Sequence, residues 1–371
     1  MMDFGFSEQQ EMFRTSVRDA LEREYPMDVV REVEEKKIDY SREFYAKMAQ
    51  MGWLGLMIPE QYGGESSNWI DAAILYEEAG KALLSSPHLV TVILGGQAIL
   101  NFGSEEQKGR LLPAITQGEI VVTWALAEPG VNSDLSLIAT KATSLDDGYT
   151  ISGTKLFVPF AHLADYLITA CRGPEGEIIL PLVGGTNGGL TSVPLDTIGG
   201  SRLDEVTFDE VRIDKGNKLG KASQADIDQL VSQAKVLSCA EMVGIAQAAL
   251  DMAIWHAEER VQFGRPIASF QTIQHKMADM SLAVQGARHL VYYTVRLLSE
   301  GIACAKERAM TCLYVGPTCN SVVRGAMHIH GGVGLSRDHN ITLFYRRAKA
   351  IQLNLGYSEL NSKIIAQELG L

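Results

Sequence analysis

One stretch, Ala326-Met327-His328-Ile329-His330-Gly331-Gly332-Val333-Gly334-Leu335, has three glycines in four positions. It follows a segment of helical character. Glycines at this density let a backbone approach a bulky, charged group closely and leave N–H groups free to face it. A Gly-Gly-x-Gly cluster alone is a weak signal, because most such clusters are ordinary turns. Its meaning therefore depends on the rest of the chain.

Two further motifs strengthen the signal. Upstream stands Glu259-Arg260-Val261-Gln262-Phe263-Gly264-Arg265-Pro266-Ile267, followed by Phe270-Gln271-Thr272-Ile273-Gln274. Together with the glycine cluster, this order resembles the C-terminal half of the acyl-CoA dehydrogenases, flavoenzymes that desaturate acyl-CoA thioesters between Cα and Cβ. The run Gly55-Leu56-Met57-Ile58-Pro59-Glu60-Gln61-Tyr62-Gly63-Gly64 is similar to the signature of that family's N-terminal helical domain. The resemblance covers almost the whole chain, from Phe4 to Leu371.

Composition narrows the class of protein. The 371 residues suffice for two or three layers around a core, and 46% of them are hydrophobic, as in soluble globular proteins. The net charge of −12 argues against non-specific nucleic-acid binding. We find neither a signal peptide nor an apolar run of the roughly 18 residues that a membrane span needs. The five scattered cysteines have no metal spacing and predict reduced thiols in a cytoplasmic protein.

Residue periodicity predicts an α+β protein of three domains. Residues 1–119 show helical spacing of apolar side chains. Residues 120–222 carry short strands and turns without a long helical period, so we expect no β-α-β units and no Rossmann layer. Residues 223–371 are helical again, with dense faces of small apolar residues suited to a four-helix bundle. The resemblance implies the acyl-CoA dehydrogenase fold, which has the same three parts.

The resemblance also implies a cofactor and a mechanism. In the family, FAD lies between the β domain and the bundle, a glutamate removes the α proton, and the β hydrogen passes as hydride to the flavin. The flavin straddles a dimer interface: one subunit holds the isoalloxazine, and its neighbour contacts the pyrophosphate and adenosine. The implied partners are acyl-CoA, an electron-transfer flavoprotein and a second subunit, which is either another copy or a paralogue.

The residues that would contact a neighbour's FAD are retained, with His328 in place of the more usual glutamine. An arginine suits a buried diphosphate because its charge is fixed and its donors form a planar fork. The alternative for Arg260 is a simple ion pair with Glu258 or Glu259. The retained set is Arg260 at the pyrophosphate, Phe263 at the adenine, and Gln271, His328, Gly331 and Gly332 along the adenosine diphosphate.

The residues that would hold the isoalloxazine in this chain are altered. The family pattern is a hydroxyl residue before E-P-G-x-G-S-D, and later K-x-[FW]-[IV]-[ST]-N. Here Ala127 takes the first hydroxyl position, Asn132 that of the second glycine, and Pro159-Phe160 that of the hydroxyl–asparagine pair. Proline offers neither a hydroxyl nor an N–H. The remaining expected contacts to the ring are Trp124, Ser133 and Phe157.

The catalytic base is missing from both positions that the family uses. These positions hold Leu355 and Ala234, neither of which can take a proton, and loss of a positioned base costs roughly 10²–10⁴-fold in rate. Glu241 is the remaining candidate for a displaced base, although a structural or solvated glutamate is the simpler interpretation. Arg347 stands where active homomeric members usually carry aspartate.

These departures predict the non-catalytic subunit of a heterotetrameric (α2β2) bacterial acyl-CoA dehydrogenase, as in enzymes that act on steroid side chains or other bulky acyl-CoAs. Its own flavin half-site would then be filled by side chains such as Leu355, Tyr357 and Phe160. One alternative is a self-sufficient homo-oligomeric dehydrogenase with Glu241 as base. Another is a flavin oxidase or oxygenase of the same fold. The acyl group stays open.

Overall fold

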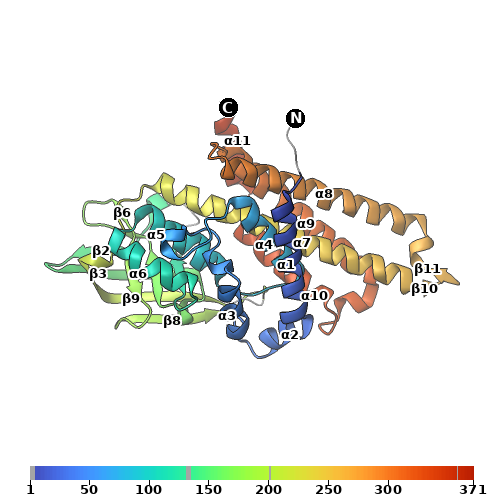
Figure 1. Ribbon diagram of the computed structural model, residues 1–371, viewed down its shortest axis with the longest axis horizontal. Helices are drawn as coiled ribbons and strands as arrows, with labels where there is room; N and C mark the ends of the chain where they lie inside the picture. The colour runs from blue at the N-terminus through green and yellow to red at the C-terminus, as the bar shows by residue number, and fades with distance from the viewer. Residues whose placement is uncertain (1–4, 131–134, 200–201, 357) are drawn as a thin grey trace.

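The computed structural model describes residues 5–130, 135–199, 202–356 and 358–371 (Figure 1). Helices, then strands, then helices follow one another along the chain, which confirms the expected α+β architecture. In Figure 1 the β domain lies at the left together with the helices of residues 97–116, the earlier N-terminal helices lie nearer the centre, and the long C-terminal helices extend to the right.

The N-terminal part is helical, as its periodicity predicts. Ser7 begins the first helix with a capping box, in which its hydroxyl accepts from Gln10 N–H at 3.2 Å and the Gln10 side chain accepts from Ser7 N–H at 3.1 Å. A π-helical run, Leu89–Gly96, leads directly into α5. The helices are α1 (Glu8–Glu24), α2 (Met27–Glu35), α3 (Arg42–Gln50), α4 (Trp69–Lys81), α5 (Gln97–Phe102) and α6 (Glu105–Thr116).

The β domain contains two sheets within its described residues, ordered β1-β4-β7 and β6-β5-β2-β3-β9-β8. The long β3 and β9 pair antiparallel, with a bulge between Lys155 and Val158. Ile151, Val206 and Phe208 form part of a core of their own. The strands are β1 (Val122–Ala125), β2 (Lys141–Ser144), β3 (Gly148–Pro159), β4 (Tyr166–Thr169), β5 (Cys171–Arg172), β6 (Ile178–Ile179), β7 (Leu182–Gly184), β8 (Leu190–Leu195) and β9 (Leu203–Asp214).

The C-terminal part is a bundle built around α7. By length and composition α7 is apolar enough to cross a membrane, but 61% of its most apolar window lies inside the fold, which is the packing of a core helix. The five cysteines are free and buried. The elements are α7 (Gln224–Glu259), the hairpin β10 (Val261–Gln262) and β11 (Arg265–Pro266), α8 (Gln271–Ser299), α9 (Ala305–His330), α10 (Ile341–Asn354) and α11 (Ser358–Glu368).

Two glycines allow α4 and α7 to cross in backbone contact. A Cβ on Gly80 would lie 2.1 Å from the carbonyl oxygen of Glu241, and one on Gly244 would lie 1.9 Å from that of Glu77. Any side chain at either position would force the helices apart. The crossing joins the N-terminal helices to the bundle and fixes the positions of Glu77 and Glu241.

Replacing Gly244 with alanine should therefore destabilise the fold by on the order of 3 kcal/mol, because a close-packed crossing cannot absorb the methyl group. Chemical denaturation of the purified protein measures this. The matched control is Gly109→Ala on α6, where an added Cβ meets no atom within 4 Å, and where alanine should stabilise the helix by up to about 1 kcal/mol. Equal effects at the two sites would contradict the account of the crossing.

His88 joins α4 to the loop before the π-helical run as a buried, neutral imidazole. Its Nδ1 accepts from the Tyr76 hydroxyl at 2.7 Å, and its Nε2–H donates to the Trp53 carbonyl at 2.9 Å. Burial lowers the pKa of His88 to about 4, although the bond to Trp53 acts in the opposite direction. Protonation would remove the acceptor that Tyr76 needs.

Because the pKa of His88 is lower in the folded chain than the usual 6.5, its contribution is complete above pH 6.5 and is lost as the pH falls toward 4. The free energy of unfolding should drop by about 3 kcal/mol over that range. His88→Gln should lower stability at neutral pH and remove this share of the pH dependence. His275→Gln on the exposed surface of α8 is the control, and a His88→Gln variant with the wild-type pH profile would refute the assignment.

Candidate functional site

One end of the bundle gathers the predicted nucleotide-contacting residues. Arg260 caps the C-terminus of α7, Phe263 forms the tip of the β10–β11 hairpin, and Gln271 is the first residue of α8. His328 lies in the last turn of α9, and Gly331 follows that helix. Figure 1 shows the hairpin at the far right tip of the molecule. Residues 260–271 and residues 328–332, two stretches far apart in the sequence, thus share one end of the bundle, which we call the adenosine end.

The hairpin presents an aromatic ring to solvent. Phe263 and Gly264 both have positive φ, 55° and 80°, as a two-residue type I′ turn requires. For an aromatic residue this backbone conformation costs on the order of 1 kcal/mol. The Phe263 side chain is 93% exposed, and its ring meets Phe270 edge-on at 6.1 Å. Strain and exposure at one aromatic residue are typical of a binding contact.

The turn after α9 leaves its backbone open. Added Cβ atoms at Gly331 or Gly332 would meet nothing within 4 Å, and Gly331 has a φ of 65° that favours glycine. His328 Nδ1 accepts from the Lys276 ammonium at 2.8 Å, which places a cation beside the turn. A nucleotide could therefore approach the main chain here without steric conflict.

Three histidine side chains pack together beside the turn after α9. The rings of His256 and His330 stack at 4.5 Å, and His339 meets His330 edge-on at 4.7 Å. The Nδ1–H of His330 donates to the Ala326 carbonyl at 2.8 Å. Burial, reinforced by the neighbouring His330, lowers the pKa of both His256 and His339. Sequence analysis did not single out His256 or His339, because nothing in their spacing shows that α7 and the turn meet.

The predicted ring-contacting residues lie on the β domain, which we call the ring end. Trp124 is buried in β1, and its Nε1 has no hydrogen-bond partner among the described residues. Phe157 sits in the bulge of β3 with a φ of 56° and is 57% exposed. Ser133 and Asn132 lie outside the described residues. The ring end therefore offers an exposed aromatic surface and one orphaned buried donor.

The polar partners expected for a flavin ring are absent at positions 127 and 159. The Pro159 carbonyl already accepts from the Thr123 hydroxyl at 2.5 Å. Phe160, with a φ of 55°, is buried and packs edge-on against Tyr40 at 6.0 Å. Its ring thus joins the β domain to the loop after α2. Phe160 fills the space between the β domain and that loop. Tyr357 lies outside the described residues.

Glu128, which follows β1, is held by a buried ion pair and by backbone hydrogen bonds. Glu128 accepts from the Lys155 ammonium at 2.6 Å and from the backbone N–H groups of Ala139 and Thr140 at 2.6 and 3.1 Å. Burial would raise the pKa of Glu128, but these bonds outweigh burial and lower it. The carboxylate is therefore charged and fully engaged as a structural group.

The two family base positions are occupied by buried apolar side chains. Leu355 caps α10 and lies against Gly316 of α9, and Ala234 is buried within α7. Glu241 has a partner: its Oε1 accepts from Arg347 at 3.3 Å, and the same Arg347 nitrogen donates to the Leu84 carbonyl at 3.2 Å. Burial raises the pKa of Glu241, and Arg347 opposes that rise. The glutamate thus forms a structural ion pair between α7 and α10.

Comparison with known proteins identifies the family. Models of the acyl-CoA dehydrogenase N-terminal, middle and C-terminal domains match residues 7–119, 123–211 and 227–370. The chain belongs to the acyl-CoA dehydrogenase family. The members of this family are FAD-dependent flavoprotein oxidoreductases with acyl-CoA substrates.

Individual relatives match over nearly their full length. The probable acyl-CoA dehydrogenase YngJ of Bacillus subtilis is 33% identical over 99% of this chain and 100% of its own. The caffeyl-CoA reductase-Etf complex subunit CarC of Acetobacterium woodii is 30% identical over 97% of this chain and 98% of its own. Among solved structures, the Tcur3481-Tcur3483 steroid ACAD superposes with a TM-score of 0.88 at 27% identity, covering 98% of each chain.

The structural role of Glu241 is testable by removing its partner. Arg347→Leu should destabilise the protein by about 1–3 kcal/mol, because it leaves a largely buried carboxylate unpaired. The double variant Glu241→Leu with Arg347→Leu should recover most of that loss, since no buried charge remains. Urea denaturation of the wild type and the three variants forms the cycle. An Arg347→Leu variant with wild-type stability would show that the ion pair does not fix these helices.

Proposed function

We propose that this chain is the cofactor-completing subunit of an FAD-dependent acyl-CoA dehydrogenase. It binds the adenosine diphosphate half of an FAD whose isoalloxazine lies in a paralogous catalytic partner. The observation that carries this proposal is the contrast between the two ends of the chain. The adenosine end keeps its cation, its exposed aromatic and its open glycine turn. At the ring end, by contrast, alanine and proline occupy positions 127 and 159, and the two family base positions hold Leu355 and Ala234.

The arrangement of the chain supports a site divided between two subunits. In Figure 1 the β domain and the β10–β11 hairpin lie at opposite ends of the long axis of the molecule. Two halves so placed cannot meet on one dinucleotide within a single chain. A complete site therefore needs a second chain, and the asymmetry between the two ends favours a partner different from this one.

At the adenosine end, each residue has a distinct task. Arg260 would neutralise the diphosphate with a planar set of donors, and Phe263 would stack on the adenine face. The open turn at Gly331 and Gly332 would let the main chain approach the phosphates. Bound FAD would supply the hydride chemistry, and this chain would supply only position and charge.

The relatives support the same assignment. The name of the steroid ACAD structure joins two designations, Tcur3481 and Tcur3483, which suits an enzyme built from two kinds of chain. CarC is named as a subunit of a reductase-Etf complex, so we propose an electron-transfer flavoprotein as the redox partner of the assembled enzyme. Its substrate would be an acyl-CoA, and we place the enzyme in the cytoplasm.

One observation favours a second candidate, a self-sufficient dehydrogenase with Glu241 as its base. Glu241 follows Ala234 by seven residues, so both lie on the same face of α7, two turns apart. Against this stands Arg347, which holds the carboxylate in an ion pair. An acyl-CoA panel with an artificial electron acceptor tests the isolated chain, and turnover that disappears in Glu241→Gln would establish this alternative.

The experiment for the proposed function is co-expression with a paralogous partner, which we expect in a neighbouring open reading frame. The complex should carry about one FAD for each pair of chains, and this chain alone should retain little. If this chain purifies alone with stoichiometric FAD, the proposal fails. The neighbouring paralogue should also retain the glutamate and the flavin-ring hydroxyls that this chain lacks.

A single substitution tests the adenosine end within that complex. Arg260→Gln should reduce FAD content at least tenfold at limiting FAD, because a charge-assisted bond to the pyrophosphate contributes roughly 1.5–3 kcal/mol. The matched control is Arg23→Gln, an exposed arginine of α1 paired with Glu24, which should leave FAD content unchanged. Equal FAD content in both variants would remove Arg260 from the site.

A further inference from the structure

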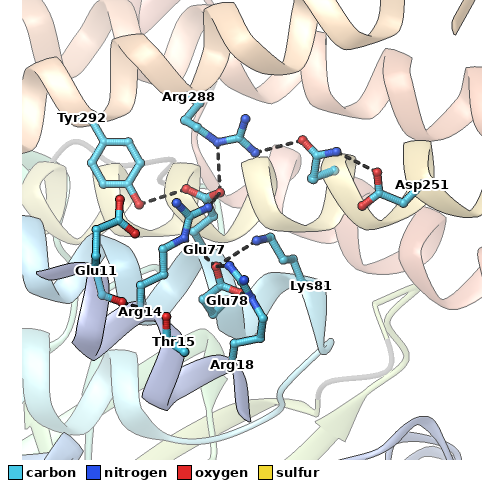
Figure 2. Close-up of polar contacts among 11 residues, drawn as sticks. Glu11, Arg14, Thr15, Arg18, Glu77, Glu78, Lys81, Asp251, Arg288 and Tyr292 are labelled. Atoms are coloured by element: carbon cyan, nitrogen blue, oxygen red, sulfur yellow. Dashed lines mark hydrogen bonds and ion pairs between the residues drawn. The ribbon is translucent and has the colours of Figure 1, made fainter. Parts of the chain in front are cut away.

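A cavity that belongs to neither end opens among α1, α4, α7, α8 and the start of α2. Its volume is about 850 Å³, within the range of small-molecule sites. Figure 2 shows the polar side chains on one side of it: Arg14 and Arg18 from α1, Glu78 and Lys81 from α4, and Arg288 from α8. None of the predicted cofactor-contacting residues lines it.

The polar wall carries more cations than its buried acids require. Glu77 accepts from Arg288 Nε at 3.0 Å and from the Tyr292 hydroxyl at 2.9 Å. Glu78 accepts from Arg14, Arg18 and Lys81 at 2.8 to 3.2 Å. Both glutamates are almost wholly buried. Two carboxylates are thus paired with four cations, whereas ion pairs that only join helices need one cation for each carboxylate.

The Glu78 carboxylate is charged and therefore has no proton to donate. Burial would raise its pKa, but the bonds from Arg18, Lys81 and Arg14 outweigh burial and lower the pKa to about 2. Donor capacity is also left over. The Nη1 groups of Arg18 and Arg288 have no hydrogen-bond acceptor among the described residues. Spare guanidinium N–H groups such as these can donate to the oxygens of an oxyanion.

The rest of the cavity limits what that anion can be. Leu21, Tyr25, Met27 and Ala82 form an apolar lining beyond the cations, which suits a hydrocarbon or aromatic body. Two exposed acids, Glu22 and Asp251, stand at its edge. They would repel a polyanion such as a nucleotide diphosphate. A ligand with one compact negative charge and an apolar body would match both the cations and the apolar lining.

We propose that this cavity binds a small amphipathic carboxylate, with the carboxylate on Arg18, Arg288 and Lys81 and the apolar body against Leu21, Tyr25 and Met27. The site is separate from the FAD-completing role and does not depend on it. The ion network fixes α1 against α4 and α8, so the ligand would lie where the N-terminal helices join the bundle.

The test uses octanoate as the probe and isothermal titration of the protein as purified, alone or with its partner. Octanoate should bind, and octylamine, with the same chain and the opposite charge, should not. Arg18→Gln should weaken octanoate binding at least tenfold; Arg14 and Lys81 still satisfy Glu78 in that variant. Arg23→Gln, on the same helix but outside the cavity, should bind octanoate as the wild type does.

A second variant guards against a folding defect in the first. Gln285→Trp places a large side chain at the exposed mouth of the cavity without touching the ion network, and it should also abolish octanoate binding. The proposal is overturned if octanoate does not bind at about 10 mM. It is equally overturned if octanoate binds Arg18→Gln and Gln285→Trp with wild-type affinity, because the ligand then occupies another site, such as an acyl pocket.

Discussion

The two sets of predicted FAD contacts lie at opposite ends of a long molecule, and the proposed function depends on that separation. The helix crossing at Gly80 and Gly244 joins the N-terminal helices to α7, and α7 itself runs from the β domain to the adenosine end. In the proposed function, this separation divides cofactor binding between two subunits.

The two ends differ in how they use aromatic residues in strained conformations. Phe263 and Phe157 both have positive φ and exposed rings, at the adenosine end and the ring end respectively. Phe160 has the same strained backbone, but its ring is buried against Tyr40. Beside the ring end, Glu128 and Lys155 form a buried ion pair. Alanine and proline occupy positions 127 and 159, where the family resemblance leads us to expect hydroxyl groups.

Local signals in the sequence predicted much of this structure. The helical spacing of the N-terminal residues and the helix–strand–helix order both depend on neighbouring residues. Sequence analysis missed β2 and β8, since short, polar, partly exposed strands have little alternation. It could not find Arg347 as the partner of Glu241, or the histidine stack, because tertiary packing alone joins those segments. The charged cavity was missed for the same reason, since its walls come from five helices.

The most direct measurement is a structure of the complex of this chain with its paralogous partner and FAD. The adenine should lie against Phe263 and the diphosphate on Arg260 of this chain, with the isoalloxazine in the partner beside a glutamate. An isoalloxazine ordered against Phe157 and Pro159 of this chain, with Glu241 released from Arg347 and directed at the substrate, would contradict it.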